Sequence, residues 1–145
     1  MQQVISAFQR LLPDFVEQVS AEIVTTHIPV YETLPRPHVQ RALYNAIHSL
    51  GVDLERGTTS AYANYWREVA FQRARQGISP VHSMLVTNLS THVMTSQLKQ
   101  RLEQEPQALA WWLERMHTII SLGMLVMTEA RINALRQLGQ LPAAG

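Results

Sequence analysis

The sequence contains no cysteine. This absence excludes disulfides, thiolate nucleophiles, zinc–thiolate sites and thioether-linked cofactors, and it fits a reducing compartment. Lysine occurs once among the 12 Lys and Arg residues, and these balance 11 Asp and Glu residues, so no net charge draws the chain to nucleic acid or to an anionic membrane. No apolar run approaches the roughly 18 residues of a membrane span, and the N-terminus lacks the pattern of a signal peptide. We therefore expect a soluble, cytoplasmic protein with no membrane span and no nucleic-acid partner.

Motifs that carry enzyme chemistry are also scarce. The chain has no Gly-rich phosphate loop and no nucleophile elbow, and its only two aspartates, Asp14 and Asp53, are both predicted to be exposed. Glu114 and His117 form Glu-x-x-His, which is half of the ligand set of a di-iron helical bundle, but a second such motif is missing. A plain surface pair is the ordinary interpretation. We expect no enzymatic activity, no metal and no resident cofactor.

The apolar residues follow a helical period almost throughout, and no segment alternates as a strand would. A chain of 145 residues with 46% hydrophobic content is long enough for one domain with a core. We predict an all-α domain of about five to six helices over residues 1–140, with 141–145 as a tail or the start of a linker to an output domain. Pro13 is predicted to split the first helix, and a further helix is predicted from Pro37 to Gly57.

The stretch from Ser60 to Pro80 predicts one helix and a sharp corner. Its aromatic and apolar residues recur at three- and four-residue steps on one face, and Ser60 is placed to cap the start. Gly77 is suited to the left-handed conformation that closes a helix, and Ser79-Pro80 is a typical N-cap followed by a first helical residue. The next helix is predicted to run from Ser79 to about Glu103.

The last helix is predicted from Pro106 to about Leu138, a length of about 48 Å. Such a helix is long for a small domain, so we expect it to protrude or to meet a partner. Its apolar stripe is ordinarily core, but the two-sided pattern and the length of the helix favour contact with a partner. The predicted dimer interface consists of Trp112, Met116, Ile120, Met124 and Met127.

The corner Arg73-Ala-Arg75-Gln-Gly77-Ile-Ser-Pro80, preceded by Tyr65-Trp66, resembles sensor-type globins. More closely, it is similar to the non-haem globin domains at the N-termini of RsbR-type stressosome proteins. In haem-binding sensor globins this corner reads His-x-Arg-Ile-Gly, with the proximal histidine four residues before the glycine. Here Arg75 and Gly77 match, but Arg73 stands at the ligand position, and a guanidinium has no lone pair to offer iron.

The resemblance implies a globin-like fold with a long C-terminal helix, and a pocket lined by Tyr62, Trp66, Val69, Arg73, His82, Leu85, Leu89 and His92. Family members pair through their terminal helices and pass a signal to an output domain. We therefore expect a regulatory or sensory homodimer that acts on an output domain or a signalling partner in a stress response. The alternative is a sensor that binds haem, with His92 or His82 as axial ligand, or a fatty acid or other apolar small molecule. For these two histidines the ordinary interpretation is a polar residue at the edge of the core.

Overall fold

A computed structural model describes residues 1–143 and contains six helices in this part of the chain. They are α1 (Gln2–Thr26), α2 (Pro29–Glu32), α3 (Arg36–Arg56), α4 (Ser60–Arg75), α5 (Pro80–Arg101) and α6 (Pro106–Gln137). No strand occurs among the described residues. The predicted all-α class and the long C-terminal helix are confirmed, since α6 has 32 residues. Of the predicted tail 141–145, residues 144–145 lie outside the described part.

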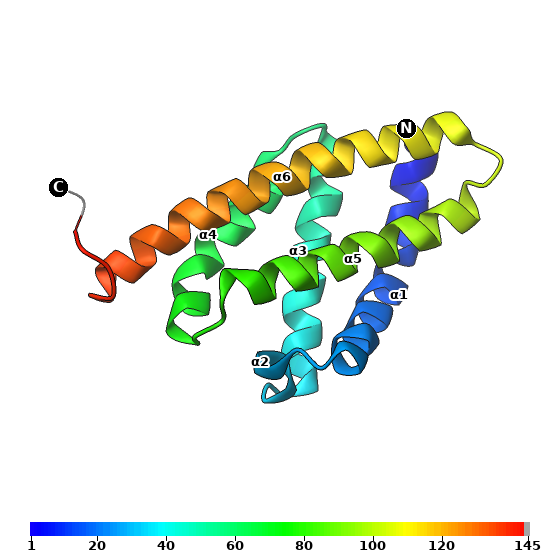
Figure 1. Cartoon of the computed structure of the whole chain (residues 1–145). Helices are drawn as coiled ribbons and strands as arrows, with labels where there is room; N and C mark the ends of the chain where they lie inside the picture. The colour runs from blue at the N-terminus through cyan, green and yellow to red at the C-terminus, as the bar shows by residue number, and fades with distance from the viewer. Residues whose placement is uncertain (144–145) are drawn as a thin grey trace.

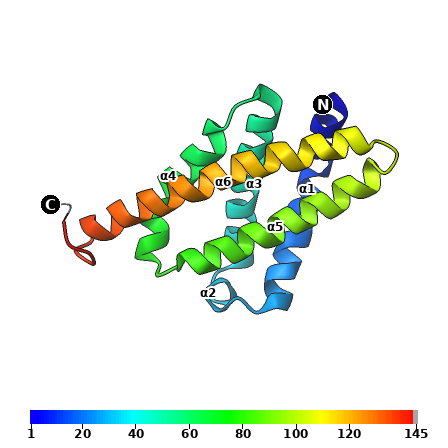
Figure 2. The same ribbon diagram turned by 45° about the horizontal axis from the view of Figure 1, so that its top comes forward.

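The helices form two crossing groups around one core. α5 and α6 run antiparallel, joined by a short turn, and cross over α1 and α3 in both views (Figures 1 and 2). α4 packs against α6 more extensively than any other pair of helices pack, and α1 packs between α3 and α5. The last turns of α6 extend past the corner between α4 and α5 (Figures 1 and 2). The protruding end that the sequence predicted is therefore present.

α1 is one continuous helix, so the predicted split at Pro13 is wrong. Pro13 lies on the exposed side of the helix, while Phe8, Leu11 and Phe15 are buried on the opposite face. Proline cannot donate the backbone hydrogen bond that a helix interior requires. Burial of the apolar side chains before and after Pro13 in one helix outweighs the loss of that bond, so the helix continues.

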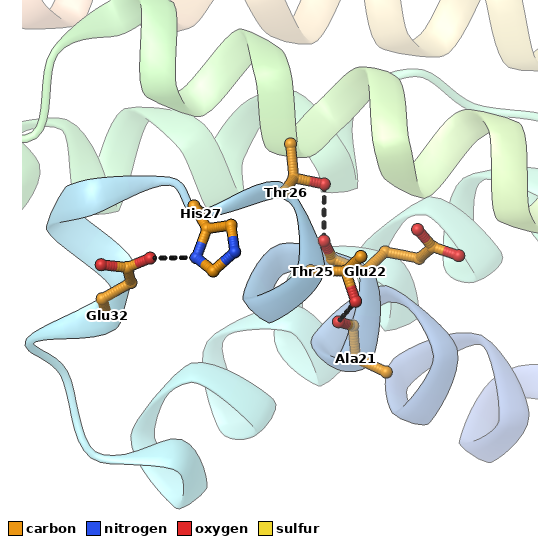
Figure 3. A network of polar contacts seen from close by, with 6 residues as sticks. All are labelled: Ala21, Glu22, Thr25, Thr26, His27 and Glu32. Carbon is orange, nitrogen blue, oxygen red and sulfur yellow. Dashed lines mark hydrogen bonds and ion pairs between the residues drawn. The ribbon is translucent and has the colours of Figure 1, made fainter.

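α1 ends at a residue in a left-handed conformation. His27 has φ 54°, and its backbone N–H donates to the carbonyl of Val24. The hydroxyls of Thr25 and Thr26 donate to the carbonyls of Ala21 and Glu22, and the His27 ring lies 3.0 Å from a Glu32 carboxylate oxygen (Figure 3). The chain then continues into α2, a single helical turn that precedes α3.

The start of α4 depends on a buried carboxylate from α3. Asp53 is fully buried, and its two oxygens accept the backbone N–H groups of Ala61 and Tyr62, each at 2.9 Å, and the hydroxyl of Thr58. The predicted exposure of Asp53 is therefore wrong, and so is the predicted cap at Ser60, because Asp53 accepts the first N–H groups of α4 instead. The negative carboxylate satisfies donors that the first turn of a helix leaves free.

α6 holds α4 at both ends and in the middle. Arg115 donates to the carbonyl of Thr58 at 2.8 Å, just before α4, and Arg131 donates to the carbonyl of Ile78, just after it. Between these arginines, Gly123 lies against the Tyr62 ring so closely that an added Cβ would stand 2.5 Å from a ring carbon. The lack of a side chain at Gly123 allows the two helices to approach.

The corner after α4 agrees with the sequence prediction. Gly77 has φ 69°, Ile78 is fully buried, and the Ser79 hydroxyl accepts the backbone N–H of Val81 at the start of α5. The backbone N–H of Ile78 donates to the carbonyl of Arg73 at 3.0 Å, which closes the last turn.

We expect Gly123→Ala to destabilise the protein by about 1–3 kcal/mol, because the new methyl overpacks the buried Tyr62 ring. Alanine in an exposed helix interior would instead stabilise by up to about 1 kcal/mol. Chemical denaturation measures the difference, with Ser121→Ala, an exposed position on the same helix, as control. Equal or higher stability of Gly123→Ala would contradict the close approach.

Asp53→Ala should lower the free energy of unfolding by about 3 kcal/mol or more, since it leaves buried donors at the start of α4 without an acceptor. Asp14→Ala is the matched control, because Asp14 is exposed and its removal should change stability by less than about 0.5 kcal/mol. Similar denaturation midpoints for the two variants would show that the carboxylate of Asp53 does not stabilise the α4 start.

Candidate functional site

A small cavity lies between α3, α4 and α5 and has a volume of about 40 Å³. Most of its wall is aliphatic, and the polar groups come from α2, α4 and α5. The lining residues are Tyr31, Val39, Ala42, Leu43, Ala46, Ile47, Leu50, Tyr62, Tyr65, Trp66, Arg73, Val86, Thr87, Ser90, Met94 and Ile120.

Two buried aromatic residues place polar atoms at this cavity. Burial raises the pKa of Tyr62 to about 12, and the neighbouring Trp66 and Thr87 side chains offset part of that rise. The Trp66 indole N–H nevertheless has no hydrogen bond of normal geometry within the described residues, although the residue is only 5% exposed. An unsatisfied donor of this kind is rare in folded proteins and is normally met by a water molecule or a ligand.

A second polar group lies at the outer edge of the cavity. The Tyr65 hydroxyl donates to the carbonyl of Ala42 at 3.2 Å and is approached by the Arg73 guanidinium at 3.5 Å. Burial raises the pKa of Tyr31, and the positive charge of Arg73 partly counteracts this effect, which places Arg73 near Tyr31 as well. Arg73 is half-buried, and no carboxylate within residues 1–143 forms an ion pair with it.

Of the eight predicted pocket residues, the structure brings Tyr62, Trp66 and Arg73 to the cavity. The other five do not line it. Leu85 and His92 are exposed, whereas Val69, His82 and Leu89 are half-buried elsewhere. The Nδ1 atom of His82 is buried without a hydrogen-bond partner in the described chain. Four of these five lie on α5, which turns its opposite face, with Val86, Thr87 and Ser90, toward the cavity. Val69 belongs to α4 and lies outside the cavity wall.

The sequence did not predict that α3 lines the cavity. This helix supplies Val39, Ala42, Leu43, Ala46, Ile47 and Leu50 to the cavity wall. The signal was present, because the apolar residues of α3 recur on one helical face. Periodicity does not show that this face of α3 packs against the aromatic residues of α4.

The size of the cavity limits what it accommodates. Binding sites for drug-sized ligands enclose about 300–1,000 Å³, whereas this cavity measures about 40 Å³. A haem or a long acyl chain would fit only after α3 and α4 had moved apart. Neither His82 nor His92 stands at the cavity wall, so this arrangement offers a haem iron no histidine.

The predicted dimer interface on α6 lies largely inside the chain. Trp112 is fully buried, Met116 and Met127 are nearly so, and Ile120 and Met124 are half-buried against the core. The indole N–H of Trp112 also donates to the Thr95 hydroxyl of α5 at 3.1 Å. Trp112, Met116 and Met127 therefore pack within the chain and are not available to a second copy in this arrangement. An interface role for the half-buried Ile120 and Met124 stays a prediction.

In residues 81–90 of α5 the exposed side chains are more apolar than the buried ones. Val81, Met84 and Leu85 are 60%, 50% and 43% exposed, whereas Ser83, Thr87 and Ser90 are buried. The Thr87 and Ser90 hydroxyls donate to backbone carbonyls one turn earlier, which satisfies them inside. The usual polarity of an amphipathic helix is thus reversed in this part of α5.

The outer surface of α6 continues this apolar surface. Ser121, Leu125, Thr128 and Ile132 recur on one exposed face, with Leu125 65% exposed. Contacts from Arg131 to Ile78 and from Trp112 to Thr95 fix the antiparallel register, so Leu125 lies level with the first turns of α5. We call Val81, Met84, Leu85, Leu125 and Ile132 the outer apolar face.

The outer apolar face also lies in the uncharged part of the chain. The 23 residues between Arg75 and Lys99 include no Asp, Glu, Lys or Arg, and neither do the 13 residues between Arg115 and Glu129. Solvent-exposed helix surfaces are normally rich in these residues, whereas the centres of protein interfaces are depleted of them.

α6 is the one helix in residues 1–143 that is long and apolar enough to cross a membrane, with a mean hydropathy of 1.2 over 18 residues. The sequence analysis expected no such segment. Length and composition alone are weak evidence, because the core helix of a soluble protein meets the same criteria. The apolar residues of α6 serve the core on one side and the outer apolar face on the other.

The predicted metal half-site is on the surface. Glu114 and His117 are both exposed. Within residues 1–143 no three or more His, Asp or Glu side chains gather as a metal site. A comparison with protein families, curated proteins and solved structures finds no match for this chain.

Alkaline pH should unfold the protein through Tyr62. Because burial raises the pKa of this phenol from 10.0 to about 12, its stabilisation is complete below pH 10 and is lost as pH rises toward 12. The loss approaches about 1.4 kcal/mol per pH unit. Denaturant titrations at several pH values should show a smaller alkaline loss for Tyr62→Phe than for Tyr44→Phe, which removes an exposed hydroxyl. Equal pH dependence of both variants would contradict the burial of the Tyr62 hydroxyl.

Proposed function

We propose that the protein is a cytoplasmic regulatory module, globin-like in its helix order, that acts by protein contacts rather than by catalysis. It pairs with a second copy through the outer apolar face of α5 and α6 and passes a signal to an output domain or partner. The observation that carries this proposal is the reversed polarity of residues 81–90 of α5, where Val81, Met84 and Leu85 are exposed while Ser83, Thr87 and Ser90 are buried.

Reversed polarity has a direct energetic meaning. Each exposed Val, Leu or Met side chain would gain about 1.5–3 kcal/mol if it were fully buried. The α5 residues of the face and Leu125 lie in uncharged stretches of the chain, whereas the exposed Glu129 lies between Leu125 and Ile132 on α6. Two antiparallel helices from each copy could stack as a four-helix arrangement about a two-fold axis, which is the commonest symmetry of homo-oligomers.

The resemblance at Arg73–Pro80 supports a second copy as the occupant, because sensor globins pair through their terminal helices. The same resemblance suggests a role in signalling, with Arg73 in place of the haem ligand. The haem or fatty-acid alternative is less well supported, because the cavity measures about 40 Å³ and no histidine lines it.

The test is self-association of matched variants. Wild-type protein should sediment as a dimer at tens of micromolar, and Leu85→Glu or Leu125→Glu should weaken dimerisation at least 30-fold, the effect of an interface hot spot of about 2 kcal/mol. Val24→Glu is the control, since Val24 is 58% exposed on α1, away from this face. A monomeric wild type, or equal association of all variants, would refute the proposed dimer.

A further inference from the structure

We propose that Arg73 binds the carboxylate of a short-chain organic acid whose uncharged end enters the cavity between α3, α4 and α5. The inference is independent of dimerisation. It starts from a cation without a counter-ion: Arg73 is half-buried, and within residues 1–143 its side chain makes one long hydrogen bond, to the Tyr65 hydroxyl at 3.5 Å. A guanidinium carries five donors, and a partly buried one is normally paired with an acid.

The surroundings of Arg73 favour an anion. A surface groove of about 140 Å³ lies between α3 and α4 and shares Ala42, Tyr65 and Arg73 with the inner cavity. Besides Arg73, its polar lining comes from His38, Arg41, Asn45, Gln72 and Gln76, with no acidic residue among them. The side chains of Arg73 and Tyr65 therefore separate a basic groove outside from a mostly apolar cavity inside.

The chemistry of the junction selects a carboxylate. The planar guanidinium can donate two parallel hydrogen bonds to a carboxylate, and the hydroxyl of Tyr31, which lines the same cavity, is a further potential donor. A monoanion matches the single charge of Arg73 at the cavity edge, whereas a phosphate dianion would remain partly uncompensated there.

The inner cavity sets the length of the acid. One water-sized atom needs about 10–15 Å³, so about 40 Å³ admits roughly three such atoms. A chain of three or four carbons fits this space, and a long acyl chain does not.

The experiment is calorimetric titration of the full chain with butyrate. Wild-type protein should bind butyrate with a dissociation constant below about 5 mM, and should bind butyramide, octanoate, chloride and phosphate at least tenfold more weakly. Arg73→Met, which keeps the stem and removes the charge, should weaken butyrate binding at least tenfold. Arg75→Met is the control, because Arg75 is exposed in the same turn, outside the cavity and the groove, and its effect should stay within twofold.

Each opposite result overturns the proposal. Failure of wild-type protein to bind butyrate, or equal binding by Arg73→Met, removes Arg73 as the recognition group. Equal binding of butyramide, chloride or phosphate removes the carboxylate specificity, and equal binding of octanoate removes the size limit. If Arg73→Met does not fold, as judged by circular dichroism, the comparison of butyrate with butyramide on wild-type protein still decides the question.

Discussion

The rest of the fold depends on the buried carboxylate of Asp53. It joins α3 to the first turn of α4, and Arg115 of α6 donates to backbone carbonyls of Asp53 and Thr58 in the same loop. Three helices therefore meet at one charged group that has no contact with water. Because α4 is fixed here, Tyr62 and Trp66 point between α3, α5 and α6, where they form both the core and the cavity wall.

In its first half, α5 places hydroxyl side chains in the interior and large apolar side chains on the surface. Thr87 and Ser90 can line its inner side because their hydroxyls donate to backbone carbonyls one turn earlier in the same helix. Small inner side chains also let α5 approach the neighbouring helices closely. The larger apolar side chains, Val81, Met84 and Leu85, are left outside, so the same packing that closes the core creates the outer apolar face.

In this chain the sequence predicts local backbone structure more accurately than it predicts which residues are buried. Gly77, Ser79 and Pro80 act through their own backbone conformation, and the structure confirms the corner that they predict. Asp53 could not be predicted as buried, because its partners are backbone N–H groups that any sequence provides. Periodicity places Trp112 and Met116 on one side of a helix, but it does not distinguish a face that packs within the chain from one that packs against another copy. Half of the pocket was misassigned for the same reason, since either face of α5 had the right spacing.

The cavity and the outer apolar face are connected through the corner that follows α4. The carbonyl of Arg73 accepts the N–H of Ile78, and the carbonyl of Ile78 accepts the guanidinium of Arg131 on α6. A ligand that displaces Arg73 thus acts on the turn that Arg131 holds, and Arg131 is the neighbour of Ile132 on the outer apolar face. Such a chain of contacts couples the two sites energetically only if the corner between them can adopt two arrangements. The corner is the place to look for them, because it combines a left-handed Gly77 with a fully buried Ile78 that resists small displacements.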